Sequence, residues 1–203
     1  MNHALQRGVL PFQANHAHQS TQSLYPSGDY IRVEVVDTGK NYYVPGKFIP
    51  KDRQIRELNR VIVIDRNNQN QGVFEKIDNN WTLISYTLAT TGATGRYAQP
   101  TSLGYYYAIE KRNQFYYYED GTTRIQGYAP YAIRFNGGAY VHGVPVNYLY
   151  SEKGERITPP KIEYSKSIGT VPLSHKCVRN YTSHAKFLYD WYREDETIII
   201  VIE

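Results

Sequence analysis

Cys177 is the only cysteine of this 203-residue chain, and it lies in the polar segment Ser174-His175-Lys176-Cys177-Val178-Arg179-Asn180. A single cysteine cannot form an internal disulfide, so a disulfide scaffold does not explain it. A thiol near an imidazole can perform nucleophilic catalysis, because the histidine takes the thiol proton as the sulfur attacks. Free cysteine is also among the most buried residue types, but the polar neighbours His175 and Arg179 fit an apolar packing site poorly. The segment therefore predicts chemistry at Cys177.

The histidine that would activate this thiol is expected before it in the chain. His184, which follows Cys177, lies near the start of a predicted helix. His142 ends a predicted strand. His175 lies two residues before Cys177, so on an extended segment the His175 and Cys177 side chains would point the same way. His142 and His175 are therefore the candidate bases.

These residues resemble the signature of the L,D-transpeptidases of the YkuD type. In that family a histidine followed by a small residue precedes, after a variable insert, Ser/Thr-His-Gly-Cys with an aliphatic residue and an Arg or Asn behind it. Here His142-Gly143 precede Ser174 to Arg179, and the likeness covers roughly residues 60–203. A glycine-rich stretch before the histidine also resembles the family, in Thr90-Thr91-Gly92, Pro100-Thr101 and Gly104.

The resemblance implies that Cys177 is the nucleophile and that His142 is its base, oriented by the backbone carbonyl of Gly143. A backbone acceptor removes the need for an acidic third member. His175 is expected to support the site through hydrogen bonds, with base duty as its less favoured role. The backbone N–H groups of Lys176 and Cys177 are expected to hold the oxyanion.

Two further residues are expected on the substrate side. Arg179 could bind a substrate carboxylate through two hydrogen bonds, and a structural ion pair explains it equally well. Ser174 is expected to contribute mainly by fixing the local backbone. Lys176 departs from the family, because most members carry glycine there, and we expect it to have an ordinary negative φ. The stretch between His142 and Cys177 is also longer than in many members.

The family resemblance also implies the substrate and the surroundings. These enzymes cleave peptidoglycan stem peptides, release D-alanine from an acyl-enzyme and pass the acyl group to an amine or to water, without a cofactor. A monomer in the periplasm or cell envelope is expected, after removal of an export signal that this sequence does not contain. Lys and Arg are scattered rather than clustered in a stripe, which argues against nucleic acid. No apolar run approaches the roughly 18 residues of a membrane helix.

Two other classes of protein remain open at this stage. His142, His175 and Cys177 could be zinc ligands, although no common zinc spacing is present. Alternatively, the chain could be a cell-wall-binding module that has lost activity, with Lys176 as the lesion. Either would use the same residues without acyl transfer.

The pattern of apolar residues predicts a mostly β protein, with β-sandwich-like mixed sheets and one or two short helices. A helix is predicted over residues 183–191, because Ala185, Leu188, Tyr189 and Tyr192 fall on one face, with Thr182 or Ser183 as its cap. A second short helix is predicted over residues 51–60. We expect a polar mobile arm over residues 1–27, a small β segment or first strands over 28–59, and the catalytic domain over 60–203.

The 21 tyrosines are the compositional oddity of the chain. Two runs, residues 105–107 and 116–118, flank the polar stretch 110–114, and this predicts a β-hairpin. A stacking surface for sugars is one interpretation, and tyrosine on a half-buried sheet is the better one. The insert over residues 147–167 could form part of a lid or groove wall, or a surface excursion.

Overall fold

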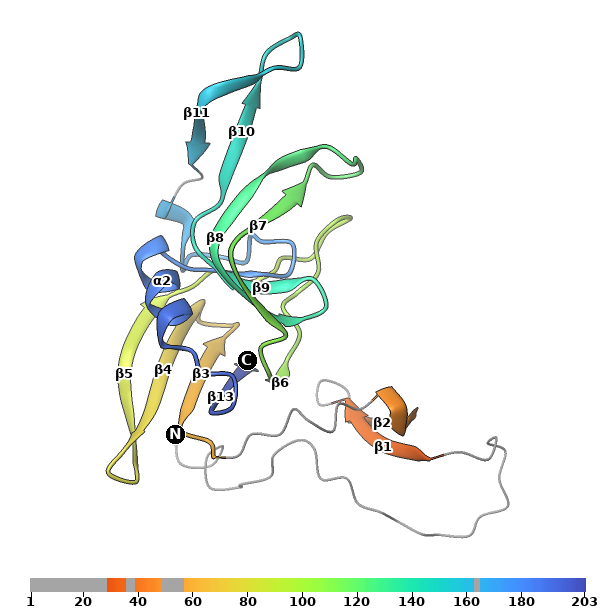
Figure 1. Ribbon diagram of the computed structural model, residues 1–203, viewed down its shortest axis with the longest axis vertical. Coiled ribbons are helices and arrows are strands. Elements are labelled where there is room, and N and C mark those ends of the chain that lie inside the picture. Colours follow the sequence, from red (N-terminus) through yellow and green to blue (C-terminus); the bar gives the residue numbers. More distant parts are fainter. Residues whose placement is uncertain (1–28, 36–38, 49–56, 163–164) are drawn as a thin grey trace. The chain divides into compact units, whose positions relative to one another are not determined.

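The computed structural model describes residues 29–35, 39–48, 57–162 and 165–203 (Figure 1). The chain divides into two compact units, residues 1–54 and 55–203. In the first unit, β1 (Tyr30–Val35) pairs antiparallel with β2 (Lys40–Pro45), and a short 3-10 helix, η1 (Gly46–Phe48), follows. The arm predicted over residues 1–27 lies outside the described residues.

The second unit is built from two sheets. The five-stranded sheet has the order β5-β4-β3-β13-β6, formed by β3 (Arg60–Asp65), β4 (Asn70–Ile77), β5 (Asn80–Leu88), β6 (Gly104–Tyr106) and β13 (Thr197–Ile202). The six-stranded sheet has the order β11-β10-β8-β9-β12 with β7 beside β8, formed by β7 (Glu110–Tyr118), β8 (Ile125–Asn136), β9 (Ala139–His142), β10 (Val146–Tyr150), β11 (Arg156–Ile162) and β12 (Val178–Arg179). The pairs β3–β13 and β9–β12 are parallel, whereas the other strand pairs are antiparallel. The predicted mostly β fold with mixed sheets is confirmed.

The core lies between these sheets. Ile62 and Ile199 come from the five-stranded sheet, and Val141 and Val178 from the six-stranded sheet, and all four are buried in one cluster. Full burial of such a side chain stabilises the fold by about 1.5–3 kcal/mol. Val141 and Val178 are direct neighbours of the two residues predicted to do chemistry, so the core fixes the backbone of the site.

The helix α2 (Thr182–Trp191) confirms the predicted helix near the end of the chain. It contributes Ala185 and Leu188 to the core, and they are 1% and 0% exposed. In Figure 1 the helix lies against the sheets beside β8, and its contacts with β8 exceed those with β9. The apolar stripe at helical spacing therefore marks the face that this helix buries. No helix in the described ranges is long and apolar enough to cross a membrane.

The predicted cap of this helix is wrong. Tyr181 is the N-cap residue and makes no side-chain cap bond. The Thr182 hydroxyl instead accepts a hydrogen bond from the Val144 backbone N–H, at 3.1 Å. A tertiary contact with the loop after β9 has thus taken the hydroxyl that a local cap would have used. Of the second helix predicted over residues 51–60, residues 51–56 lie outside the described part, and Arg60 begins β3.

The predicted tyrosine hairpin is also wrong. The first run belongs largely to β6, where Tyr105 pairs with Ile200 of β13 in the five-stranded sheet. The polar stretch 110–114 does not turn, because β7 runs through it and pairs with β8 along its length. The polar side chains of β7 face solvent, so a strand accommodates them without a turn. The turn follows Tyr118 instead, at residues 119–124, where Gly121 has a φ of 72°.

Candidate active site

A parallel pair of strands brings the predicted base and nucleophile together. Arg179 of β12 is the register partner of His142 in β9, and Val178 is the partner of Val141. The Asn180 backbone N–H extends the pairing by donating to the His142 carbonyl at 2.8 Å. Cys177 immediately precedes this pair of strands, so residues far apart in sequence line one cavity.

His142 is held in one orientation by its surroundings. It is 3% exposed, and its Nδ1 lies 2.6 Å from the carbonyl oxygen of Gly143. A carbonyl oxygen can only accept, so Nδ1 carries the proton and Nε2 has the free lone pair. The Phe115 ring packs edge-on against the imidazole, with centroids 5.2 Å apart. Gly143, the residue predicted to orient the base, therefore contacts the His142 imidazole through its backbone carbonyl oxygen, as expected.

Gly143 is itself required by close packing. A Cβ at this position would lie 2.9 Å from the Pro130 side chain and 3.2 Å from the Thr182 backbone. The Gly143 N–H also donates to the Pro130 carbonyl at 2.8 Å. A larger residue would push the chain away from β8 and move the carbonyl that faces His142.

Cys177 is partly exposed and lines the cavity. Its Sγ lies 3.8 Å from the carbonyl oxygen of Gly138. Burial raises the pKa of Cys177 to about 11, against smaller lowering effects from a Tyr140 backbone hydrogen bond and from the charges of Arg179 and Lys176. Burial likewise lowers the pKa of His142 to about 3, partly offset by its bond to Gly143. At neutral pH the two groups are therefore a neutral thiol and a neutral imidazole.

The glycine-rich stretch before β6 supports the loop that carries the thiol. A Cβ on Gly92 would lie 2.2 Å from the Gln99 carbonyl oxygen and 2.8 Å from the Lys176 Cα, so only glycine allows this contact. The buried Thr101 hydroxyl accepts from the Gly92 N–H at 2.8 Å and donates to the Lys176 carbonyl at 2.9 Å. The close approach explains the glycine at position 92, and the two hydrogen bonds explain the threonine at position 101.

Ser174 is 2% exposed, and its hydroxyl donates to the Cys177 carbonyl at 2.5 Å. Its backbone N–H donates to Thr91 at 3.1 Å. These contacts fit the expected role of fixing the local backbone. Contact of Ser174 with substrate stays a prediction.

Lys176 does not have a positive φ, as expected. The backbone of this loop therefore accommodates lysine in place of the family's usual glycine. Among the described residues, no backbone carbonyl accepts a hydrogen bond from the N–H of Lys176 or of Cys177. Both groups are thus available for the predicted oxyanion role, which itself stays a prediction.

His175 lies on a bend rather than on an extended strand. Its Nε2 lies 2.9 Å from Oδ1 of Asp120, and both side chains are about half exposed. Since the imidazole points at a carboxylate in the turn after β7, it is oriented across the cavity.

The cavity has a volume of about 430 Å³, within the range of small-molecule sites. One wall is the nucleophile loop, with His175, Lys176, Cys177 and Arg179. The opposite wall is the β7–β8 hairpin, whose contribution consists of Phe115, Tyr117, Tyr118, Glu119, Asp120 and Gln126. The described residues of the insert, 147–162 and 165–167, do not line the cavity, and they form most of β10, then β11 and the 3-10 helix η2 (Ser165–Ser167).

Within the described ranges, no group of three His, Cys, Asp or Glu side chains is arranged to hold a metal ion. His142, His175 and Cys177 are therefore not gathered as the alternative zinc site would require.

Sequence reasoning missed Asp120 and Phe115, which complete the site from the β7–β8 hairpin. The dipeptide Asp120-Gly121 is a strong turn signal between two β runs, and it locates the turn that the tyrosine runs obscured. Nothing in the local sequence indicates that this turn would meet His175, because their contact spans 55 residues.

Comparison with known proteins places this site in a family. A family model of the L,D-transpeptidase catalytic domain (YkuD) matches residues 59–201. The chain belongs to the L,D-transpeptidase catalytic domain family. A comparison with curated proteins finds no match.

Solved structures share the fold at low sequence identity. The L,D-transpeptidase LdtMt1 in complex with imipenem is 16% identical, with a TM-score of 0.52 over 88% of this chain and 69% of that chain. An L,D-transpeptidase from Mycobacterium smegmatis is 17% identical, with a TM-score of 0.51 and the same coverages. A fused Zn-dependent amidase/peptidase/peptidoglycan-binding domain-containing protein from Clostridium acetobutylicum is 22% identical, with a TM-score of 0.48 over 71% of this chain. The chain spans 52% of that last structure's length.

Proposed function

We propose that the protein is a cysteine acyltransferase that acts on peptidoglycan stem peptides, with residues 60–203 as its catalytic domain. The observation that carries the proposal is the placement of the His142 imidazole, fixed by Gly143, beside Cys177 in one cavity. Membership of the L,D-transpeptidase family supports the same chemistry. The chain would act as a monomer in the periplasm or cell envelope.

In the first step Nε2 of His142 takes the Cys177 proton as the sulfur attacks. The sulfur attacks the carbonyl before the terminal D-alanine, and the Lys176 and Cys177 N–H groups hold the oxyanion. Collapse of the tetrahedral intermediate breaks the peptide bond, and the leaving D-alanine amine takes the proton from His142. A thioester remains on Cys177.

An acceptor then completes the cycle. An amine gives up its proton to His142 and attacks the thioester, and the thiol is restored by return of that proton to sulfur. Water in place of the amine gives carboxypeptidase activity. The same geometry therefore accounts for crosslinking, anchoring or trimming, according to the acceptor that reaches the cavity.

Mass spectrometry after exposure to a carbapenem tests this proposal. The wild-type protein is expected to gain the mass of one carbapenem, because attack on the β-lactam carbonyl acylates Cys177. Cys177→Ala should gain none, and its circular dichroism should match the wild type, because little volume changes. An adduct that persists in Cys177→Ala would refute the cysteine mechanism. Absence of any adduct in the wild type would favour the alternative of an inactive wall-binding module.

A further inference from the structure

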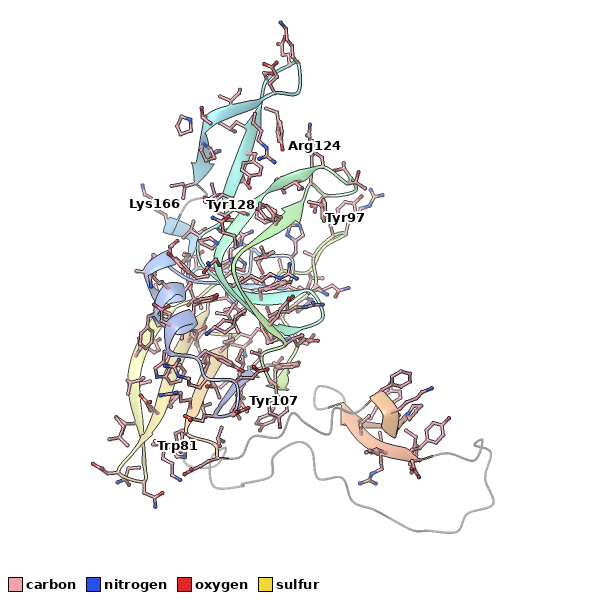
Figure 2. The ribbon with its side chains drawn as sticks, in the orientation of Figure 1. Trp81, Tyr97, Tyr107, Arg124, Tyr128 and Lys166 are labelled. Atoms are coloured by element: carbon pink, nitrogen blue, oxygen red, sulfur yellow. The ribbon has the colours of Figure 1, made fainter. Side chains whose placement is uncertain are left out.

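The His175–Asp120 contact joins the two walls of the cavity. His175 belongs to the nucleophile loop, and Asp120 to the turn between β7 and β8. Both residues line the cavity, and the carboxylate oxygen accepts from the imidazole at 2.9 Å. Figure 2 shows Tyr97 and Arg124 near this turn, which is the end of the β7–β8 hairpin that lies farther from β6. A protein carboxylate thus reaches across the opening of the cavity to the loop that carries Cys177.

The wall that Asp120 meets is cationic. Lys176 and Arg179 line the same cavity, and the positive charge of each acts to lower the Cys177 pKa. Within the described ranges, no carboxylate lies within ion-pair distance of the Lys176 ammonium. Two positive charges beside an imidazole donor form a set that recognises a carboxylate.

The neighbouring carboxylate behaves differently. Glu119 also lines the cavity, but it pairs with Arg124 of its own hairpin, at 2.5 Å. Of these two adjacent acids, Asp120 is the one with a contact to the nucleophile loop, through His175. The contact with His175 is therefore specific to Asp120 and is not a general property of the acidic turn.

We infer that Asp120 is an internal competitor that binds His175 at the edge of a carboxylate subsite, that Lys176 and Arg179 of the same cavity complete this subsite, and that a carboxylate of the substrate displaces Asp120. The inference rests on the proposed function for the identity of that substrate, an acidic peptide. Both side chains of this contact are about half exposed, and exposed polar pairs contribute little to stability, so an incoming carboxylate can replace Asp120 at little cost. Asp120 then sets the affinity for acidic ligands and discriminates between a carboxylate and its amide.

Iodoacetate and iodoacetamide provide a matched pair of probes. Both alkylate the Cys177 thiolate with loss of iodide, and they differ by a carboxylate in place of an amide. The measured quantity is the ratio of the two second-order rate constants, in which any change in thiol reactivity cancels. In Asp120→Asn we expect this ratio to rise about two- to fivefold, the range of an exposed pair. Lys176→Gln should lower it.

Glu119→Gln is the matched control, because it removes the same charge from the adjacent residue. An increase in Asp120→Asn that exceeds the increase in Glu119→Gln supports the subsite. Equal increases in the two variants would show only a change in the overall electrostatic field of the cavity and would overturn the inference. A ratio that is unchanged or lower in Asp120→Asn would also overturn it. Asp120→Ser, whose hydroxyl is too short to reach His175, should repeat the result if the asparagine variant folds poorly.

These probes require only a thiol, so they separate this inference from the proposed function. A carbapenem adduct without a specific Asp120 effect removes the inference and leaves the acyltransferase. With acidic stem peptides as donors, Asp120→Asn should lower KM by a similar factor and leave kcat unchanged. The corresponding amidated donors should show no change in KM. An equal change for both donors would contradict a carboxylate subsite.

Discussion

At the scale of single residues, the site keeps its two reacting groups uncharged. Burial is the largest influence on both, raising the pKa of Cys177 and lowering that of His142. A preformed thiolate–imidazolium pair is therefore disfavoured, and the proton moves only as the sulfur attacks. The resting thiolate fraction is therefore low, and the thiolate is the reactive form of cysteine.

The first prediction at this scale concerns the base. His142→Gln should lower the rate of acylation by about two to four orders of magnitude, because a positioned base contributes this much. His175→Gln should cost less, because its imidazole faces Asp120. Single-turnover acylation by a carbapenem measures both. The reverse order of effects would assign the base to His175.

The second prediction concerns Lys176. Its positive charge favours the thiolate and so lowers the Cys177 pKa. Lys176→Gly should therefore raise that pKa, and the rate of alkylation by neutral iodoacetamide should begin to climb at higher pH than in the wild type. Lys166→Gly is the control, because this lysine lies in η2 and does not line the cavity. An unchanged or lowered pKa in Lys176→Gly would refute the charge argument.

At the scale of elements, the periodicity of apolar residues predicts local secondary structure. The alternation and the apolar runs indicate the strands, and the stripe through Ala185 and Leu188 indicates α2, because each pattern reflects which face is buried. The tyrosine runs mislead, because β-forming residues do not specify a partner, and β6 and β7 pair in different sheets. Cys177, His142 and Gly143 were predicted from the resemblance to the family signature and not from periodicity. Asp120 was not, because its contact depends on the tertiary path of the β7–β8 hairpin.

The third prediction concerns the packing of elements at Gly92. Gly92→Ala places a methyl group against the Gln99 carbonyl and the Lys176 Cα. Overpacking of this kind costs about 1–3 kcal/mol of unfolding free energy. It should also lower the carbapenem acylation rate, because the nucleophile loop must shift. Urea unfolding and acylation kinetics report the two effects.

Gly95→Ala is the matched control for this substitution. A Cβ there would meet only the Ala98 side chain, at 3.7 Å, an ordinary contact. We expect this variant to be neutral or up to about 1 kcal/mol more stable, because alanine restricts the unfolded chain. Equal destabilisation by both substitutions would show that the close approach at Gly92 is not responsible.

At the scale of the whole molecule, buried His142 and partly buried His184 link stability to pH. Burial lowers the pKa of His142, to about 3, and of His184, which contacts Gln71 at 3.2 Å. Below the unfolded pKa of about 6.5, the unfolded chain binds protons that the folded chain excludes. The free energy of unfolding therefore rises with pH up to that value and falls as the pH drops below it.

The fourth prediction follows from this linkage. Between pH 6.5 and 5, the unfolding free energy should fall by up to about 1.4 kcal/mol per pH unit because of His142, whose folded pKa is about 3. His142→Gln should reduce this slope. Tryptophan fluorescence in urea follows the relevant unit, because Trp81 and Trp191 both lie in residues 55–203. An unchanged slope in His142→Gln would refute the assignment of this pH dependence to His142.

The parallel pairing of β9 with β12 has an evolutionary consequence. Because hydrogen bonds between adjacent strands set the distance from His142 to Cys177, the length of chain between them is free to vary. Here the intervening chain forms the hairpin β10–β11, none of whose residues lines the cavity. Lineages can therefore exchange this segment as an appendage, acquiring new binding properties without retuning the reaction centre.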